Sequence, residues 1–124
     1  MNNENLQEDT AKEILNRWLE SEGWTTTVMW GRQRGIDIEA VKGNQRWVIE
    51  VKGCGVDTAA MRVNFLESFG QVLLCMDDSE ARHSVAFPAL PYYRNLWNEL
   101  PPLAKERARI DAIFVGEDGK VEIA

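Results

Sequence analysis

The chain has 124 residues, of which 44% are hydrophobic and 27% charged, a composition typical of one globular domain rather than a disordered chain. No apolar run approaches the ~20 residues of a membrane-spanning helix, and the acidic N-terminus has no feature of a signal peptide. A net charge of −6 argues against nucleic-acid binding by the surface as a whole. We expect one cytoplasmic domain over residues 1–124, with residues 1–8 as a flexible tail and no membrane partner.

The first predicted helix follows the tail. Asp9 or Thr10 can cap its start, and Gly23 can end it. Glu13 lies at the edge of the apolar stripe and, taken alone, is typical of a surface carboxylate. The apolar positions recur at helical spacing and are Ala11, Ile14, Leu15, Trp18 and Leu19.

Three strand-like segments come next. Residues 24–30 are β-branched and aromatic, and residues 35–53 contain two alternating strands around a polar turn, which predicts a hairpin. Between them lies a basic loop flanked by glycines. Its arginines, Arg32 and Arg34, either contact phosphates or are solvated loop charges.

The remaining chain alternates helices and strands. A helix capped by Asp57 or Thr58 carries Gln71 within its apolar half, and we expect it to be largely buried. His83, the only histidine, is expected at the surface or at a strand end. This order predicts an α/β fold with a mixed sheet flanked by helices. The later elements are a strand over residues 83–90, helices over residues 91–100 and 102–108, and strands over residues 110–115 and 120–123.

The two cysteines, Cys54 and Cys75, fit no CxxC pattern and no zinc-ligand spacing. Reduced thiols are the expectation for a cytoplasmic protein, and a disulfide between them is the alternative. The sequence therefore predicts no zinc site.

Three charges stand out in the central hairpin. Asp37 lies in the first strand, and Glu50 and Lys52, two residues apart, leave the same face of the second. Two carboxylates and an ammonium so placed fit a divalent-metal site; the alternative is a surface salt bridge worth only ~0–1 kcal/mol. Residues 32–62 carry six basic and four acidic residues, against eight and sixteen elsewhere, so the segment is locally basic.

In this setting the sequence resembles the PD-(D/E)xK nuclease superfamily, which includes type II restriction enzymes, Mrr-like enzymes and Holliday-junction resolvases. The motif residues are Asp37 and the run Glu50-Val51-Lys52 at the end of the next strand. The resemblance extends over roughly residues 11–90, from the acid-bearing first helix to the helix after the hairpin. Ile36 stands where the name-giving motif has proline.

The resemblance implies a three-layer α/β/α fold of the restriction-endonuclease-like type and hydrolysis of DNA. Asp37 and Glu50 would bind Mg²⁺ or Mn²⁺, with the Val51 carbonyl as a further ligand. Lys52 would position the attacking water or help to deprotonate it, and it would stabilise the charge that develops on the phosphate. Glu13 would be an acid that either supports the direct metal ligands from outside or binds a second metal ion. Substrate contacts are implied for Arg32, Arg34 and Gln71.

A second function remains open from the sequence. The chain could be a non-catalytic member of the same fold that binds nucleic acid or protein as an accessory subunit. The small size of the chain and the net negative charge outside residues 32–62 favour this alternative, or an enzyme that works with a partner. A homodimer is a further expectation, because cutting both strands of DNA needs two sites.

Overall fold

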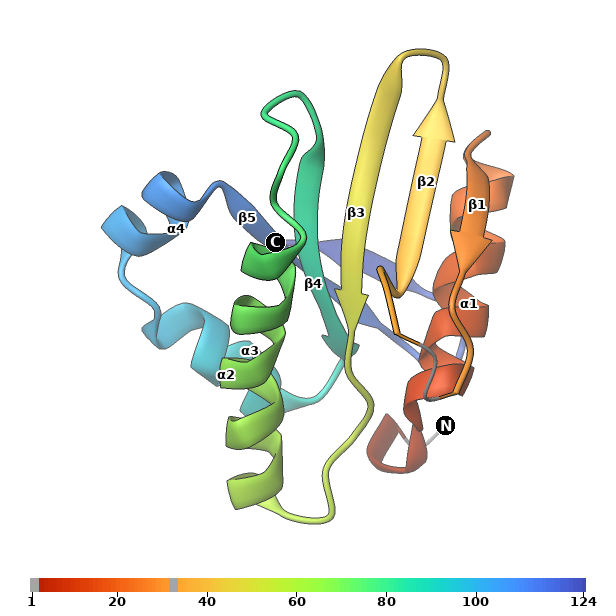
Figure 1. Cartoon of the computed structure of the whole chain (residues 1–124). Coiled ribbons are helices and arrows are strands. Elements are labelled where there is room, and N and C mark those ends of the chain that lie inside the picture. The colour runs from red at the N-terminus through yellow and green to blue at the C-terminus, as the bar shows by residue number, and fades with distance from the viewer. Residues whose placement is uncertain (1–2, 32–33) are drawn as a thin grey trace.

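The computed structural model describes residues 3–31 and 34–124, and these form a six-stranded sheet covered by helices on both faces (Figure 1). The three-layer α/β/α arrangement expected from the sequence is therefore confirmed. The helices are α1 (Glu8–Ser21), α2 (Thr58–Leu74), α3 (Pro91–Glu99) and α4 (Pro102–Ala108), after a short 3-10 turn, η1 (Asn3–Asn5). The strands are β1 (Thr25–Val28), β2 (Ile38–Lys42), β3 (Gln45–Val51), β4 (Arg82–Pro88), β5 (Ile110–Val115) and β6 (Val121–Ile123).

The strands follow one another across the sheet in chain order, β1 to β6. β1, β2 and β3 form an antiparallel meander, β3, β4 and β5 run parallel, and β6 returns antiparallel to β5. The two parallel crossovers step in the same direction, and because such connections are right-handed their helices fall on one face. α1 covers the other face (Figure 1).

Each face of the sheet has its own apolar core. Leu15, Trp47 and Ile49 belong to the core beneath α1, whereas Phe65 and Phe87 belong to the core beneath α2 and α3. Every residue of β4 after its first is buried, as expected for a parallel strand covered on both sides.

The N-terminal segment differs from the expected flexible tail. Leu6 is 2% exposed and packs in the core beneath α1. The Asn3 side chain donates a hydrogen bond to the Ala89 carbonyl and accepts one from the Glu117 amide. The tail prediction is wrong over residues 3–8 because an apolar side chain anchors the segment; residues 1–2 lie outside the described chain.

Gly53 fixes where this segment docks. A Cβ atom on Gly53 would lie 2.5 Å from the backbone nitrogen of Glu8, so only glycine fits there. Next to it, the Cys54 amide donates to the Leu6 carbonyl, and the Tyr93 hydroxyl donates to the Gly53 carbonyl at 2.8 Å. The start of α1 therefore lies directly against the chain that leaves β3.

Helix α2 is less buried than expected. Its cap is confirmed, since Asp57 Oδ1 accepts a hydrogen bond from the Ala60 amide. Leu66 and Leu74, however, are 59% and 87% exposed, and a Cβ on Gly70 would meet nothing within 4 Å. The helix packs on the sheet and α3 through one side only, so the prediction of a largely buried helix is wrong.

Two further expectations, for His83 and for the cysteine pair, are also settled. His83 lies near the start of β4, as the strand-end alternative predicted, but it is only 4% exposed because β4 is covered on both faces, which excludes a surface position. Cys54 and Cys75 are free thiols, which excludes the disulfide alternative. Within residues 3–31 and 34–124, none of the helices combines the length and the apolarity needed to cross a bilayer.

Candidate functional site

Asp37 and Glu50 stand beside each other where the β2–β3 hairpin opens. β2 pairs with β3 in a register that sets Ile38 opposite Ile49, and one further step sets Asp37 opposite Glu50. Side chains alternate along a strand, so Ile49 enters the core beneath α1 while Glu50 points to the other face. Both acids are buried, with 8% of each residue exposed. The hairpin thus brings two acids together away from water.

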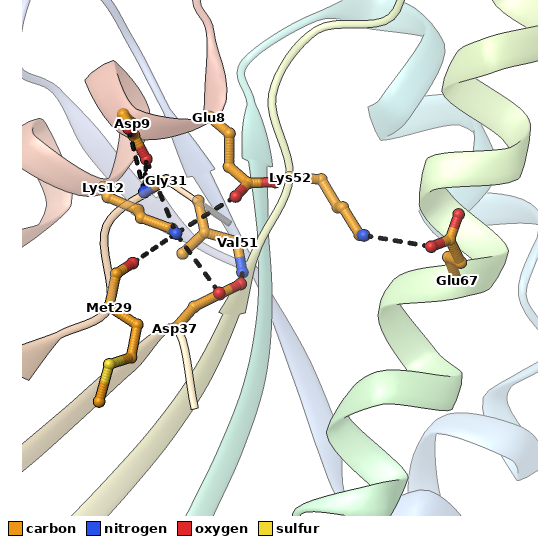
Figure 2. A network of polar contacts seen from close by, with 9 residues as sticks. All are labelled: Glu8, Asp9, Lys12, Met29, Gly31, Asp37, Val51, Lys52 and Glu67. Atoms are coloured by element: carbon orange, nitrogen blue, oxygen red, sulfur yellow. Dashed lines mark hydrogen bonds and ion pairs between the residues drawn. The ribbon is translucent and has the colours of Figure 1, made fainter. Parts of the chain in front are cut away.

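The Asp37 carboxylate is held at both oxygens. Oδ2 accepts a hydrogen bond from the Val51 amide at 2.8 Å. Oδ1 lies 3.4 Å from the ammonium nitrogen of Lys12 (Figure 2). Val51 therefore contributes its amide to the site by orienting Asp37. The role of its carbonyl as a metal ligand stays a prediction.

Burial changes the protonation of Glu50. Loss of solvation, the adjacent Asp37 carboxyl and the more distant Glu8 raise the pKa of Glu50 to about 9, although Lys52 opposes the shift. Glu50 therefore keeps its proton at neutral pH.

Lys12 of α1 is the cation that sequence reasoning missed. It is 1% exposed, its ammonium donates to the Met29 carbonyl at 2.6 Å, and it lies 3.2 Å from Glu8 Oε2. Burial alone would lower the pKa of Lys12, but Asp37 and Glu8 together raise it above its ordinary value. Lys12 is therefore a buried ammonium that joins α1 to the hairpin.

Lys52 is present at the site but turns away from Asp37. It is 9% exposed, and its ammonium lies 3.7 Å from Glu67 Oε1 on α2. Figure 2 shows the side chain extending towards α2, while the Lys12 contacts lie on the other side of the β3 exit. Glu67 is a second residue that the sequence analysis did not single out.

An open cleft of about 540 Å³ gathers most of the predicted site residues. Arg34 and Gln71 both line it, and Gln71 Oε1 is buried without a hydrogen-bond partner in the described chain. The prediction for Arg32 lies outside the described residues. The lining residues are Glu8, Gly31, Arg34, Gly35, Asp37, Glu50, Lys52, Gln71, Leu74 and Cys75.

The structure does not bring Glu13 to the cleft. Glu13 is exposed and accepts a hydrogen bond from Arg17 at 2.6 Å on the outer side of α1. The acid that α1 supplies is Glu8, four residues before Lys12 and on the same side of the helix. Neighbouring side chains on a helix are separated by roughly 100° around its axis, so Glu13 faces solvent when Lys12 faces the hairpin. Glu13 is therefore not a residue of the cleft, and Glu8 is the acid that α1 places there.

The donor set fits a hard divalent cation. No group of three or more His, Cys, Asp or Glu side chains in the described ranges is arranged to hold a metal ion. Mg²⁺, however, is commonly held by one or two carboxylates and completes its shell with waters and substrate phosphate. Asp37 and Glu50 supply two carboxyls, and a divalent cation beside them would oppose the rise in the pKa of Glu50.

Two solved structures share the fold. An XisH family protein from Nostoc punctiforme PCC 73102 superposes with a TM-score of 0.63 at 18% identity, over 90% of this chain and 95% of that chain. An fdxN element excision controlling factor protein from Anabaena variabilis does so with a TM-score of 0.64, at the same identity and coverage. No protein-family model matches the sequence, and neither does any curated protein.

Proposed function

We propose that this protein is a metal-dependent DNA endonuclease of the PD-(D/E)xK superfamily, with a restriction-endonuclease-like fold. The observation that carries the proposal is the buried pair of Asp37 and Glu50 in an open cleft, with Lys52 two residues further on. A buried pair of acids lowers the stability of a protein, because like charges repel and lose solvation, and such pairs are concentrated at functional sites.

Asp37 and Glu50 would hold Mg²⁺ or Mn²⁺, with the Val51 carbonyl as a further ligand. A divalent ion bound there polarises a phosphate and lowers the pKa of a water molecule. The amide of Val51 keeps Asp37 in one orientation, so the carboxylate needs little rearrangement when the ion binds.

Lys52 would stabilise the charge that develops on the phosphate. Its contact with Glu67 is long, at 3.7 Å, and the Glu67 side chain is 54% exposed. Such ion pairs contribute only ~0–1 kcal/mol, so an arriving phosphate can replace Glu67 at little cost. Glu67 then serves to hold the ammonium in the cleft before substrate binds.

The substrate contacts that the cleft offers are local. Arg34 is exposed at the cleft and is suited to a phosphate oxygen, and Gln71 lines the cleft with its amide oxygen buried and without a partner among the described residues. The net charge of −6 disfavours extended contact with DNA beyond this region. We therefore propose that a second copy of the chain or a larger partner complex supplies further affinity.

A non-catalytic accessory role is the second candidate. The Anabaena variabilis neighbour is named an excision controlling factor, which describes control of an excision event rather than cutting. The site is also neutralised internally, since Lys12 lies beside Asp37 and Lys52 beside Glu67. In this role the protein would bind DNA or another protein through the same cleft.

A cleavage and binding assay separates the two candidates. Supercoiled, linear, single-stranded and branched DNA are incubated with the protein in Mg²⁺, Mn²⁺ or EDTA, and binding is measured on the same DNAs. The variants are Asp37→Asn and Lys52→Met, with Glu13→Gln as a matched control away from the cleft. Metal-dependent cutting lost in the first two variants alone supports the enzyme. DNA binding that Lys52→Met weakens and Glu13→Gln does not, with no cutting of any DNA, supports the accessory role.

A further inference from the structure

The ammonium of Lys12 is enclosed by oxygen atoms. It lies 2.6 Å from the Met29 carbonyl oxygen and 3.2 Å from Glu8 Oε2. Asp37 Oδ1 is 3.4 Å away and Asp9 Oδ1 is 3.8 Å away. Carboxylate and carbonyl oxygens converging on one point are the ligands that proteins offer to hard cations. Here the cation at that point belongs to the protein.

This ammonium is held in its position by burial and by several oxygen partners. Lys12 is 1% exposed, and charged lysines are almost never so buried unless they are paired. Its partners come from three places in the chain: α1, the residue that follows β1, and the residue that precedes β2. Figure 2 shows these groups pointing to the same nitrogen.

We propose that the Lys12 ammonium fills a second cation position beside the cleft, so that the protein binds a single divalent ion. The inference rests on the proposed function in one respect: the divalent ion is the one held by Asp37 and Glu50. A second ion near Asp37 would have to share Oδ1 and Glu8 with a fixed positive charge. Like charges ~3–4 Å apart repel strongly in a buried setting, so the ammonium excludes that ion.

Lys12 is thereby a positioning residue and not a catalytic one. It orients Asp37 and Glu8 and supplies permanent positive charge, without reaching the substrate. The site keeps this charge whatever the metal concentration, and only the ion beside Glu50 exchanges with solution.

The test counts Mn²⁺ ions bound to the intact protein without DNA, by calorimetry and electron paramagnetic resonance. We expect one ion per chain for the wild type and two for Lys12→Met, because methionine keeps the volume and frees the surrounding oxygens. Lys12→Arg, which keeps the charge, should bind one. Two ions in the wild type, or only one in Lys12→Met, would overturn the inference.

The outcomes also separate this inference from the proposed function. If the wild type binds no Mn²⁺ while Lys12→Met binds one, the result supports the claim that Lys12 occupies a cation position. It contradicts the claim that Asp37 and Glu50 bind a divalent ion. If neither form binds Mn²⁺, both fail. Should Lys12→Met not fold, anomalous diffraction from Mn²⁺-soaked wild-type crystals decides: one peak beside Glu50 supports the inference, and a second peak at Glu8 overturns it.

Discussion

Asp37 and Glu50 face each other across the end of the β2–β3 hairpin, both buried, and Asp37 contributes to raising the pKa of Glu50 to about 9. Two neighbouring acids in this setting have opposing effects on the protein. They lower its stability when both are ionised, and they favour a bound cation for the same reason.

The first prediction concerns stability against pH without metal. The pKa of Glu50 rises from 4.5 to about 9 on folding, so the folded state holds this proton more tightly than the unfolded state. Its contribution is fully present below about pH 4.5 and is lost as the pH rises through about 9. In EDTA, urea unfolding should show the wild type losing at least ~1 kcal/mol more than Glu50→Gln from about pH 5 to pH 9. Parallel profiles for the two proteins would contradict the raised pKa.

The second prediction concerns stabilisation by metal. Mg²⁺ or Mn²⁺ should raise the melting temperature, by an amount equivalent to ~2.7 kcal/mol when the free ion is at about 100 times its Kd. The effect should be larger at pH 8 than at pH 6, because binding requires Glu50 to lose its proton. Differential scanning calorimetry of the wild type and Asp37→Asn measures this, and an equal rise in Asp37→Asn would place the ion elsewhere.

The third prediction contrasts two glycines. Gly70→Ala should stabilise the protein by ~0.5–1 kcal/mol, because Gly70 lies within helix α2 with open space around it. Gly53→Ala should destabilise it by ~1–3 kcal/mol, since the new Cβ would lie 2.5 Å from the Glu8 backbone nitrogen. Urea unfolding of both variants checks the signs. A neutral Gly53→Ala would mean that the start of α1 docks elsewhere.

The fourth prediction contrasts two acids of α1. Glu8→Gln removes a carboxylate 3.2 Å from the Lys12 ammonium, so it should cost ~1 kcal/mol of stability and weaken Mn²⁺ binding. Glu13→Gln changes an exposed contact with Arg17 and should stay within ~0.5 kcal/mol of the wild type. Chemical unfolding and Mn²⁺ titration of both variants test the assignment of Glu8. The reverse ranking would restore Glu13.

The fold class and the clustering of Asp37, Glu50 and Lys52 could be predicted from the sequence, because both depend on local patterns. Alternation along two strands and one hairpin turn suffices to bring Asp37, Glu50 and Lys52 to one end of the sheet. Helical periodicity likewise located α2 and its Asp57 cap.

The surroundings of the site could not be predicted in the same way. Glu8 reaches the cleft because Leu6 is buried in the core and because Gly53, which has no side chain, leaves room for the backbone at Glu8. Both contacts join segments that are far apart in sequence. Lys12 was missed because a lysine beside an apolar stripe is usually exposed, and only the converging oxygens make its burial favourable. Periodicity does not tell which edge of α1 faces the cleft, and this is why Glu13 was chosen.

The most direct test of the account is a time course of supercoiled plasmid cleavage by the purified wild type and by Asp37→Asn. We expect nicking and linearisation by the wild type in Mg²⁺ or Mn²⁺, none in EDTA, and a rate lower by ~100-fold or more in Asp37→Asn. Cleavage that persists unchanged in EDTA or in Asp37→Asn, or no cleavage by the wild type in either metal, would contradict it.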